Sequence, residues 1–128
     1  MSLPHHNLVV WQRADDFFIE VHQLTLQRFP AHERFELGSQ IRRAAWSVPS
    51  NIVEGIARRS RRDTLRFFDI SGASLREVGY GLHAARHLGY IAAEELSAFE
   101  EKIRMNTAQP RLRRGASPRA GLRSRGRA

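Results

Sequence analysis

Large apolar residues recur at intervals of three, four and seven residues along four stretches of this chain. Such spacing places them on one face of an amphipathic α-helix. The four helices predicted in this way span about residues 10–28, 33–58, 61–88 and 92–105. No stretch shows the strict alternation that is typical of a β-strand. The sequence therefore predicts an all-α, up-down four-helix bundle.

The second predicted helix has a proline in the middle of its apolar stripe. Pro49 removes one backbone hydrogen bond and its ring clashes with the carbonyl of Ala45, so we expect a kink between these residues. Trp46, Val53 and Ile56 form a second apolar edge, beyond what one core-facing stripe requires. This surplus indicates a partner surface, and these three residues are our candidates for an oligomer interface.

The third predicted helix has signals at both of its ends. Ser60 followed by Asp63 is typical of a capping box, and Gly89 suits the left-handed position after a helix C-terminus. Gly72 and Gly79 lie on the apolar stripe, where we expect them to let a neighbouring helix approach closely. The whole stripe consists of Leu65, Phe68, Gly72, Leu75, Gly79 and Leu82.

The composition changes abruptly after the fourth predicted helix. Residues 107–128 contain seven arginines, no acidic residue and only two large apolar residues. Because so few apolar groups cannot offset the entropy of ordering the chain, this segment is predicted to be disordered. The fourth helix is then shortened, and the chain divides into a bundle domain of residues 1–106 and an Arg-rich tail of residues 107–128. Out-of-frame reading of GC-rich DNA gives such a composition, so we hypothesise a shifted frame near Met105.

The same segment supplies most of the net charge of +8. Residues 1–105 carry 14 Lys and Arg against 13 Asp and Glu, so a basic surface on the bundle must come from local clustering. Arginines at a turn are often merely solvated. Arg61 and Arg62, however, begin a helix whose dipole disfavours cations, which indicates an anionic partner or acidic neighbours. The candidate nucleic-acid-binding residues are Arg42, Arg43, Arg58, Arg59, Arg61 and Arg62.

Other candidate chemistry is sparse. His83 and His87 lie four residues apart but have no identifiable third ligand, so we expect no metal site. The match of GYGLHA to a dinucleotide fingerprint lacks the preceding strand that such a site requires. Without cysteine, a nucleophile elbow or a phosphate loop, we expect neither an enzyme nor a cofactor. No apolar run approaches the ~20 residues of a bilayer span and no secretory signal is recognisable, so we expect a cytoplasmic protein.

A resemblance to a known family is carried by four segments in chain order: VWQRADDFFIEVHQLTLQRFP, SQIRRAAWSVPSNIVEGIARRSRRD, RFFDISGASLREV and ARHLGYI. Together they resemble the bacterial four helix bundle protein family, also called the 23S ribosomal RNA intervening-sequence protein family. Gly79 and Gly81 depart from that family's pattern, which more often has helix-favouring residues there. The family motif falls on Gln40, Ile41, Arg42, Arg43, Ala44, Ala45, Pro49, Asn51, Ile52, Glu54, Gly55 and Arg58.

The resemblance implies a bundle that assembles as a ring-like homopentamer without enzymatic activity. A related branch serves as the accessory protein of diversity-generating retroelements, which implies RNA or DNA and a reverse transcriptase as partners. Pro49, Asn51, Glu54 and Gly55 are then a structural motif of a kinked helix. The alternative is a protein–protein interaction module without nucleic-acid binding, in which Trp46 and Val53 are buried against identical subunits and the arginines are only solvated.

Overall fold

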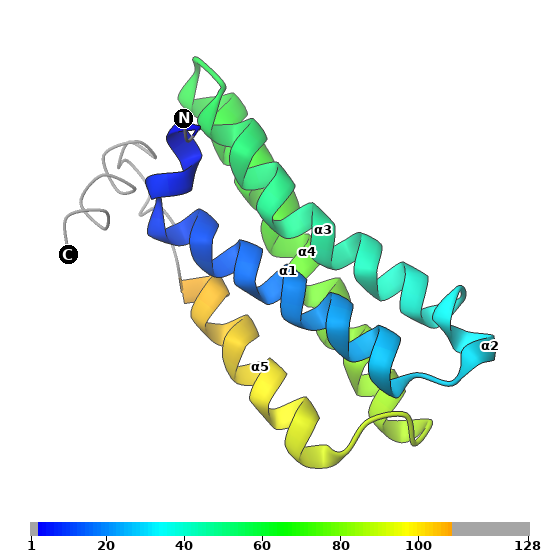
Figure 1. The fold of residues 1–128 in the computed structure, drawn as a ribbon. Coiled ribbons are helices and arrows are strands. Elements are labelled where there is room, and N and C mark those ends of the chain that lie inside the picture. Colours follow the sequence, from blue (N-terminus) through cyan, green and yellow to red (C-terminus); the bar gives the residue numbers. More distant parts are fainter. Residues whose placement is uncertain (1–2, 109–128) are drawn as a thin grey trace.

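The computed structural model describes residues 3–108. Its long helices α1 (Val9–Arg28), α3 (Leu37–Ile56), α4 (Arg61–His87) and α5 (Ala93–Ala108) run up and down beside one another (Figure 1). Two short elements complete the fold, the 3-10 turn η1 (Pro4–Asn7) and the helix α2 (Ala31–Arg34). No strand occurs within residues 3–108, and the predicted all-α, up-down four-helix bundle is confirmed.

The hydrophobic core lies where the four long helices face one another. Phe17 and Val21 of α1, Val48 of α3 and Leu82 of α4 are at most 2% exposed. The fourth helix contributes Phe99, whose ring packs edge-on against that of Phe17 with centroids 6.4 Å apart. Burial of such side chains is the main favourable term in folding, so the predicted apolar faces of α1 and α3 are the ones that stabilise the bundle.

The two ends of α4 follow the predicted local signals. The Ser60 hydroxyl accepts a hydrogen bond from the Asp63 backbone N–H at 3.1 Å, which satisfies one of the amides left without a partner at a helix start. Just after the C-terminus, Gly89 has φ +83°, a left-handed conformation that glycine adopts without steric cost. These local signals therefore determine both boundaries of the longest helix.

The predicted start of the second helix is wrong. The helix α3 begins at Leu37 rather than Glu33, because Glu36 has φ −104° and ψ −99°, which separates α3 from the short α2. Tertiary contacts stabilise this break. The Tyr90 hydroxyl donates to the Glu33 carboxylate at 2.7 Å, and its ring lies 5.4 Å from that of Phe29. The bond to the Glu33 carboxylate, together with burial, raises the pKa of Tyr90 above its usual value.

Close packing of α3 against α4 depends on a glycine that the predicted stripe omits. A Cβ atom at Gly81 would lie 2.5 Å from Ile41 Cγ1, whereas one at Gly72 would meet nothing nearer than 3.9 Å. The role predicted for Gly72 is therefore wrong, and a Cβ atom at Gly79 would make only an ordinary 3.4 Å contact with Ile103 of α5. The reason is that the buried face of α4 is rotated relative to that stripe. It comprises Thr64, Ser71, Leu75, Val78, Gly81, Leu82 and Ala85.

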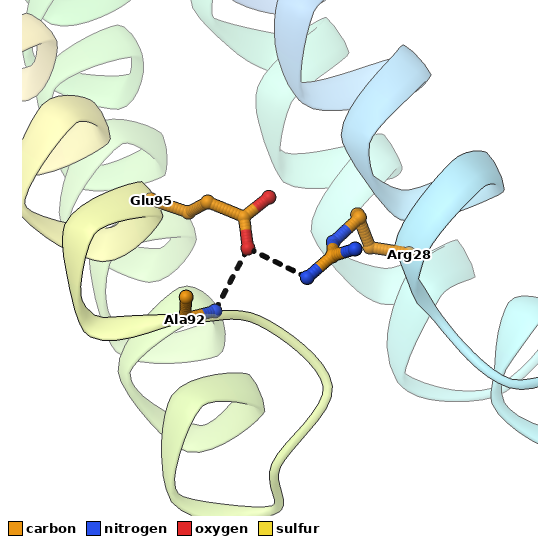
Figure 2. A network of polar contacts seen from close by, with 3 residues as sticks. All are labelled: Arg28, Ala92 and Glu95. Atoms are coloured by element: carbon orange, nitrogen blue, oxygen red, sulfur yellow. Dashed lines mark hydrogen bonds and ion pairs between the residues drawn. The ribbon is translucent and has the colours of Figure 1, made fainter.

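Polar contacts near the start of α5 hold it against α1. The Glu95 carboxylate oxygen Oε1 accepts from the Ala92 N–H at 2.8 Å and from Arg28 Nη2 at 3.0 Å (Figure 2). The first bond caps the helix and the second joins it to the end of α1, so one carboxylate sets both the start and the position of α5. A second ion pair, between Lys102 and Glu20, joins the two helices farther along.

The helix α5 continues to Ala108, two residues beyond the predicted end of the bundle domain at residue 106. Nearly all of the predicted Arg-rich tail lies outside the described residues, and so does the segment after the hypothesised frame shift. None of the helices in the described part of the chain is long and apolar enough to cross a membrane.

Candidate nucleic-acid interface

The arginine-rich turn lies at the end of a projecting helical hairpin. In the described chain α4 has 27 residues and α5 has 16, so the α3–α4 hairpin extends past the end of α5 (Figure 1). We call residues 54–69 the hairpin tip. It holds five arginines against three acidic residues, Glu54, Asp63 and Asp69. The tip therefore carries an excess of positive charge on a bundle whose charges otherwise nearly balance.

Arg58 is held in place by contacts within the tip. Its Nη2 lies 2.6 Å from Glu54 Oε2 and its Nε donates to the Glu54 carbonyl at 3.3 Å. The guanidinium carbon also lies 4.8 Å from the centre of the Phe67 ring. Glu54 and Arg58 are four residues apart, and their ion pair fixes the orientation of this arginine.

Arg66 is a member of the tip that the sequence reasoning missed. Its guanidinium carbon lies 5.3 Å from the centre of the same Phe67 ring. The spacing of four residues from Arg62 was the available signal, because residues four apart share a helix face. An open hollow in the tip is lined by Arg61, Arg62, Asp63, Leu65, Arg66 and Asp69.

Three of the five tip arginines have no acidic partner in the described chain. Within residues 3–108, no carboxylate lies within 4.0 Å of the guanidinium groups of Arg59, Arg62 or Arg66. Arg59 and Arg62 are exposed to solvent. Exposed charges without an internal ion pair contribute little to the stability of a fold.

Arg42 and Arg43 lie elsewhere and are used differently. Arg42 donates to the buried Thr25 hydroxyl at 2.9 Å and to the Arg34 carbonyl at 2.5 Å, so it joins α3 to α1 and α2. Arg43 is exposed, and it lines a separate shallow hollow between α3 and α4. Sixteen residues separate Arg42 from Arg58, about 24 Å along a helix. The structure therefore does not bring these two arginines to the hairpin tip.

The candidate interface residues differ in exposure. Trp46 is 59% exposed, and its ring lies 5.5 Å from that of Phe18 in an edge-to-face arrangement. Val53 is half-buried, whereas Ile56 packs against the hydrophobic core. Trp46 is thus the member of this group that offers the most apolar surface to a partner.

Two motif residues of α3, Ile41 and Gly55, lie close to α4, whereas Gln40, Arg43 and Glu54 are exposed. The helix stays continuous but bends at Pro49, as predicted. Asn51 Nδ2 donates to the Ser47 carbonyl at 2.7 Å and to its hydroxyl at 2.8 Å. At Gly55 a Cβ atom would lie 2.9 Å from the Phe68 ring, so α4 approaches α3 closely at this point too. These contacts are structural.

No metal site is formed within residues 3–108. His83 and His87 have ring centroids 4.4 Å apart, but no group of three or more His, Cys, Asp or Glu side chains gathers there or elsewhere in this range.

Comparison with known proteins agrees with the sequence resemblance. A search of curated proteins finds no match to this chain. The family model described as 23S rRNA-intervening sequence protein, in contrast, matches residues 6–109. The matched range begins in η1 and includes every described helix from α1 to α5. On this match, the chain belongs to the 23S rRNA-intervening sequence protein family.

Proposed function

We propose that this protein is a non-enzymatic, oligomeric helical-bundle scaffold that associates with nucleic acid through its hairpin tip. The observation that carries the proposal is the group formed by Arg59, Arg62 and Arg66, which lack acidic partners in the part of the chain that the structure describes. Phosphate contacts by such cations supply most of the sequence-independent affinity of proteins for nucleic acid. The tip lies past the end of α5 (Figure 1).

Assembly would strengthen binding by a single tip. Trp46, 59% exposed next to Phe18, supports a contact between subunits, and the family resemblance implies a homopentamer. Linked copies of one weak site raise the effective concentration of the others, so several tips bind one polyanion far more tightly than one tip does. A reverse transcriptase as protein partner and a cytoplasmic location remain predictions.

The test compares two full-length variants in which three arginines are replaced by glutamine. The tip variant changes Arg59, Arg62 and Arg66. The control variant removes the same charge from Arg34, Arg76 and Arg86, which are exposed and lie outside the tip. Both are made in a background whose seven arginines beyond residue 108 are also glutamine, because those cations alone would produce salt-dependent binding.

Binding to a duplex RNA is measured by fluorescence anisotropy across a salt series. We expect the tip variant to lose affinity and to reduce the slope of log K against log salt by up to about 2.7, since each phosphate contact contributes about 0.9. The control variant should keep the slope of the parent. Equal slopes for the tip variant, the control and the parent would refute the proposal.

The second candidate function is a protein–protein interaction module without nucleic-acid binding. The exposure of Trp46 favours it, because a large apolar side chain at the surface is stabilised by contact with another protein. Sedimentation velocity of wild type and of Trp46→Ser measures the assembly directly. An assembled wild type that binds no RNA would support the module, whereas loss of both assembly and RNA affinity in the Trp46 variant would support the oligomeric scaffold.

A further inference from the structure

We propose that the hairpin tip binds the sugar–phosphate backbone of double-stranded nucleic acid, without reading bases and without stacking on them. The proposal rests on the proposed function and names its substrate class. Proteins that prefer single strands combine a basic groove with aromatic rings on which bases stack. The question is therefore whether the tip offers such a ring.

Both aromatic residues of the tip are already used within the protein. Guanidinium groups of Arg58 and Arg66 lie over the Phe67 ring, 4.8 and 5.3 Å from its centre. The Phe68 ring packs on Gly55, where it fills the space that a Cβ atom would need. Residues 54–69 contain no other aromatic residue. An unpaired base therefore finds no free stacking surface at the tip.

The large exposed aromatic rings within residues 3–108 lie far from these cations. Phe35 is 82% exposed and precedes the start of α3, whereas the tip lies at its other end. Tyr80 is 73% exposed, but it follows Arg66 by fourteen residues, about 21 Å along α4. Trp46 is separated from Arg58 by twelve residues, about 18 Å along α3. When a single strand of nucleic acid is bound to the tip arginines, the bases next to the bound phosphates would therefore not reach these aromatic rings.

The uncharged polar groups of the tip are also committed. The Ser60 hydroxyl accepts from the Asp63 N–H, and Thr64, which is 2% exposed, donates its hydroxyl proton to the Ser60 carbonyl at 3.1 Å. Residues 54–69 contain no Asn or Gln, the side chains that pair with adenine edges. The outward-facing groups are mainly guanidiniums, which bind phosphate wherever it occurs in the sequence.

The higher phosphate charge density of a duplex then favours its binding over that of a single strand. Duplex DNA carries one phosphate charge per about 1.7 Å of its axis, and each contact releases more counterion from a duplex than from a single strand. Phe67 fixes two of the guanidiniums before binding, which lowers the entropy cost of using them. A rigid cluster of cations without a stacking ring therefore gains more from a duplex.

The test uses the full-length chain with the arginines beyond residue 108 changed to glutamine. The probes are an RNA duplex and a single strand of equal length that cannot pair with itself, each in two unrelated sequences. We expect the duplex to bind about tenfold more tightly at low salt, with the two duplex sequences within about twofold of each other. Tighter binding of the single strand, or a strong preference between the duplex sequences, would overturn the inference.

A second variant tests the positioning role of Phe67. Phe67→Leu keeps an apolar side chain but removes the ring, so we expect severalfold weaker duplex binding with an unchanged salt slope, because every cation remains. Phe67→Tyr keeps the ring and should restore affinity, whereas Arg66→Gln should lower the slope by about one. If Phe67→Leu lowers the thermal midpoint, binding is compared at a temperature at which both proteins are folded. Unchanged binding by Phe67→Leu would contradict the positioning role.

Failure of the inference and failure of the proposed function are distinguishable. If replacing Arg59, Arg62 and Arg66 leaves affinity for all probes unchanged, the tip is not a nucleic-acid site. If that variant loses affinity but the parent prefers the single strand, the tip binds nucleic acid and only the duplex inference fails.

Discussion

The body and the tip of the α3–α4 hairpin belong to the same two helices but use their polar groups differently. In the body, Ser71 is 5% exposed and donates to the Val48 carbonyl at 2.9 Å, while Arg42 donates to the buried Thr25 hydroxyl. At the tip, Arg59 and Arg62 are exposed and have no acidic partner within residues 3–108. The difference teaches that polar groups enclosed by α1, α3 and α4 hold the fold, whereas the guanidiniums of Arg59 and Arg62 at the tip have no such role.

The largest effect expected in the body comes from Gly81→Ala. Its Cβ atom would lie 2.5 Å from Ile41 Cγ1, so α3 and α4 must separate, and we expect a loss of about 2 kcal/mol in unfolding free energy. Gly72→Ala is the matched control, because its Cβ atom meets nothing nearer than 3.9 Å. The control should gain up to about 1 kcal/mol from helix propensity. Urea unfolding measures both, and equal effects would contradict the difference between the two sites.

The next largest loss of stability is expected at Arg42, whereas its neighbour in the family motif, Arg43, should show almost none. Arg42→Ala leaves the Thr25 hydroxyl and the Arg34 carbonyl without this donor, and we expect a loss of about 1.5 kcal/mol. Arg43→Ala removes an exposed side chain and should change stability by less than about 0.5 kcal/mol. Thermal unfolding of the two variants under identical conditions gives the comparison. A larger loss for Arg43→Ala would mean that Arg42 does not hold α1 and α3 together.

A smaller effect is expected at the buried hydroxyl of the hairpin body. Ser71→Ala removes the bond to the Val48 carbonyl, and we expect a loss of about 1 kcal/mol. Ser74, half-buried on the same helix, hydrogen-bonds the Ser47 hydroxyl at 2.8 Å, and Ser74→Ala should cost less because solvent reaches that group. Chemical unfolding at one temperature tests this order, which would be wrong if Ser74→Ala proved the more damaging change.

The smallest effect on stability is expected at the tip. Replacing Arg59, Arg62 and Arg66 together by glutamine should change the free energy of unfolding by less than about 1 kcal/mol, because exposed charges contribute little. The same variant should lose nucleic-acid affinity. Calorimetric melting of the free protein checks the first outcome. A large drop in the melting temperature would show that the tip arginines are structural, which would remove the contrast between the two regions.

The sequence predicted those parts of the fold that short-range chemistry determines. Ser60 with Asp63 marked the start of α4, Gly89 marked its end, and Pro49 marked the bend in α3. Each signal acts within a few residues of its own position. The break at Glu36 was missed because it depends on Tyr90 binding Glu33 from the α4–α5 connection, a contact between segments far apart in the chain.

Two features were harder to predict, namely which face of α4 is buried and which residues belong to the candidate site. A three–four spacing fits two adjacent helix faces, and only the position of Ile41 on α3 reveals that Gly81 rather than Gly72 is enclosed. At the tip, the arginines around the turn were visible in the sequence. Arg66 was not included, because its role depends on sharing the Phe67 ring with Arg58, which lies in the turn between α3 and α4.

The contact between Ile41 and Gly81 has a consequence for how such a chain can diverge. In this chain a larger residue at position 81 would need space that Ile41 occupies. Relatives that keep Ile41 but have a larger residue at position 81 should therefore hold these two helices farther apart. Although distant in the chain, the two positions together would set the spacing between α3 and α4.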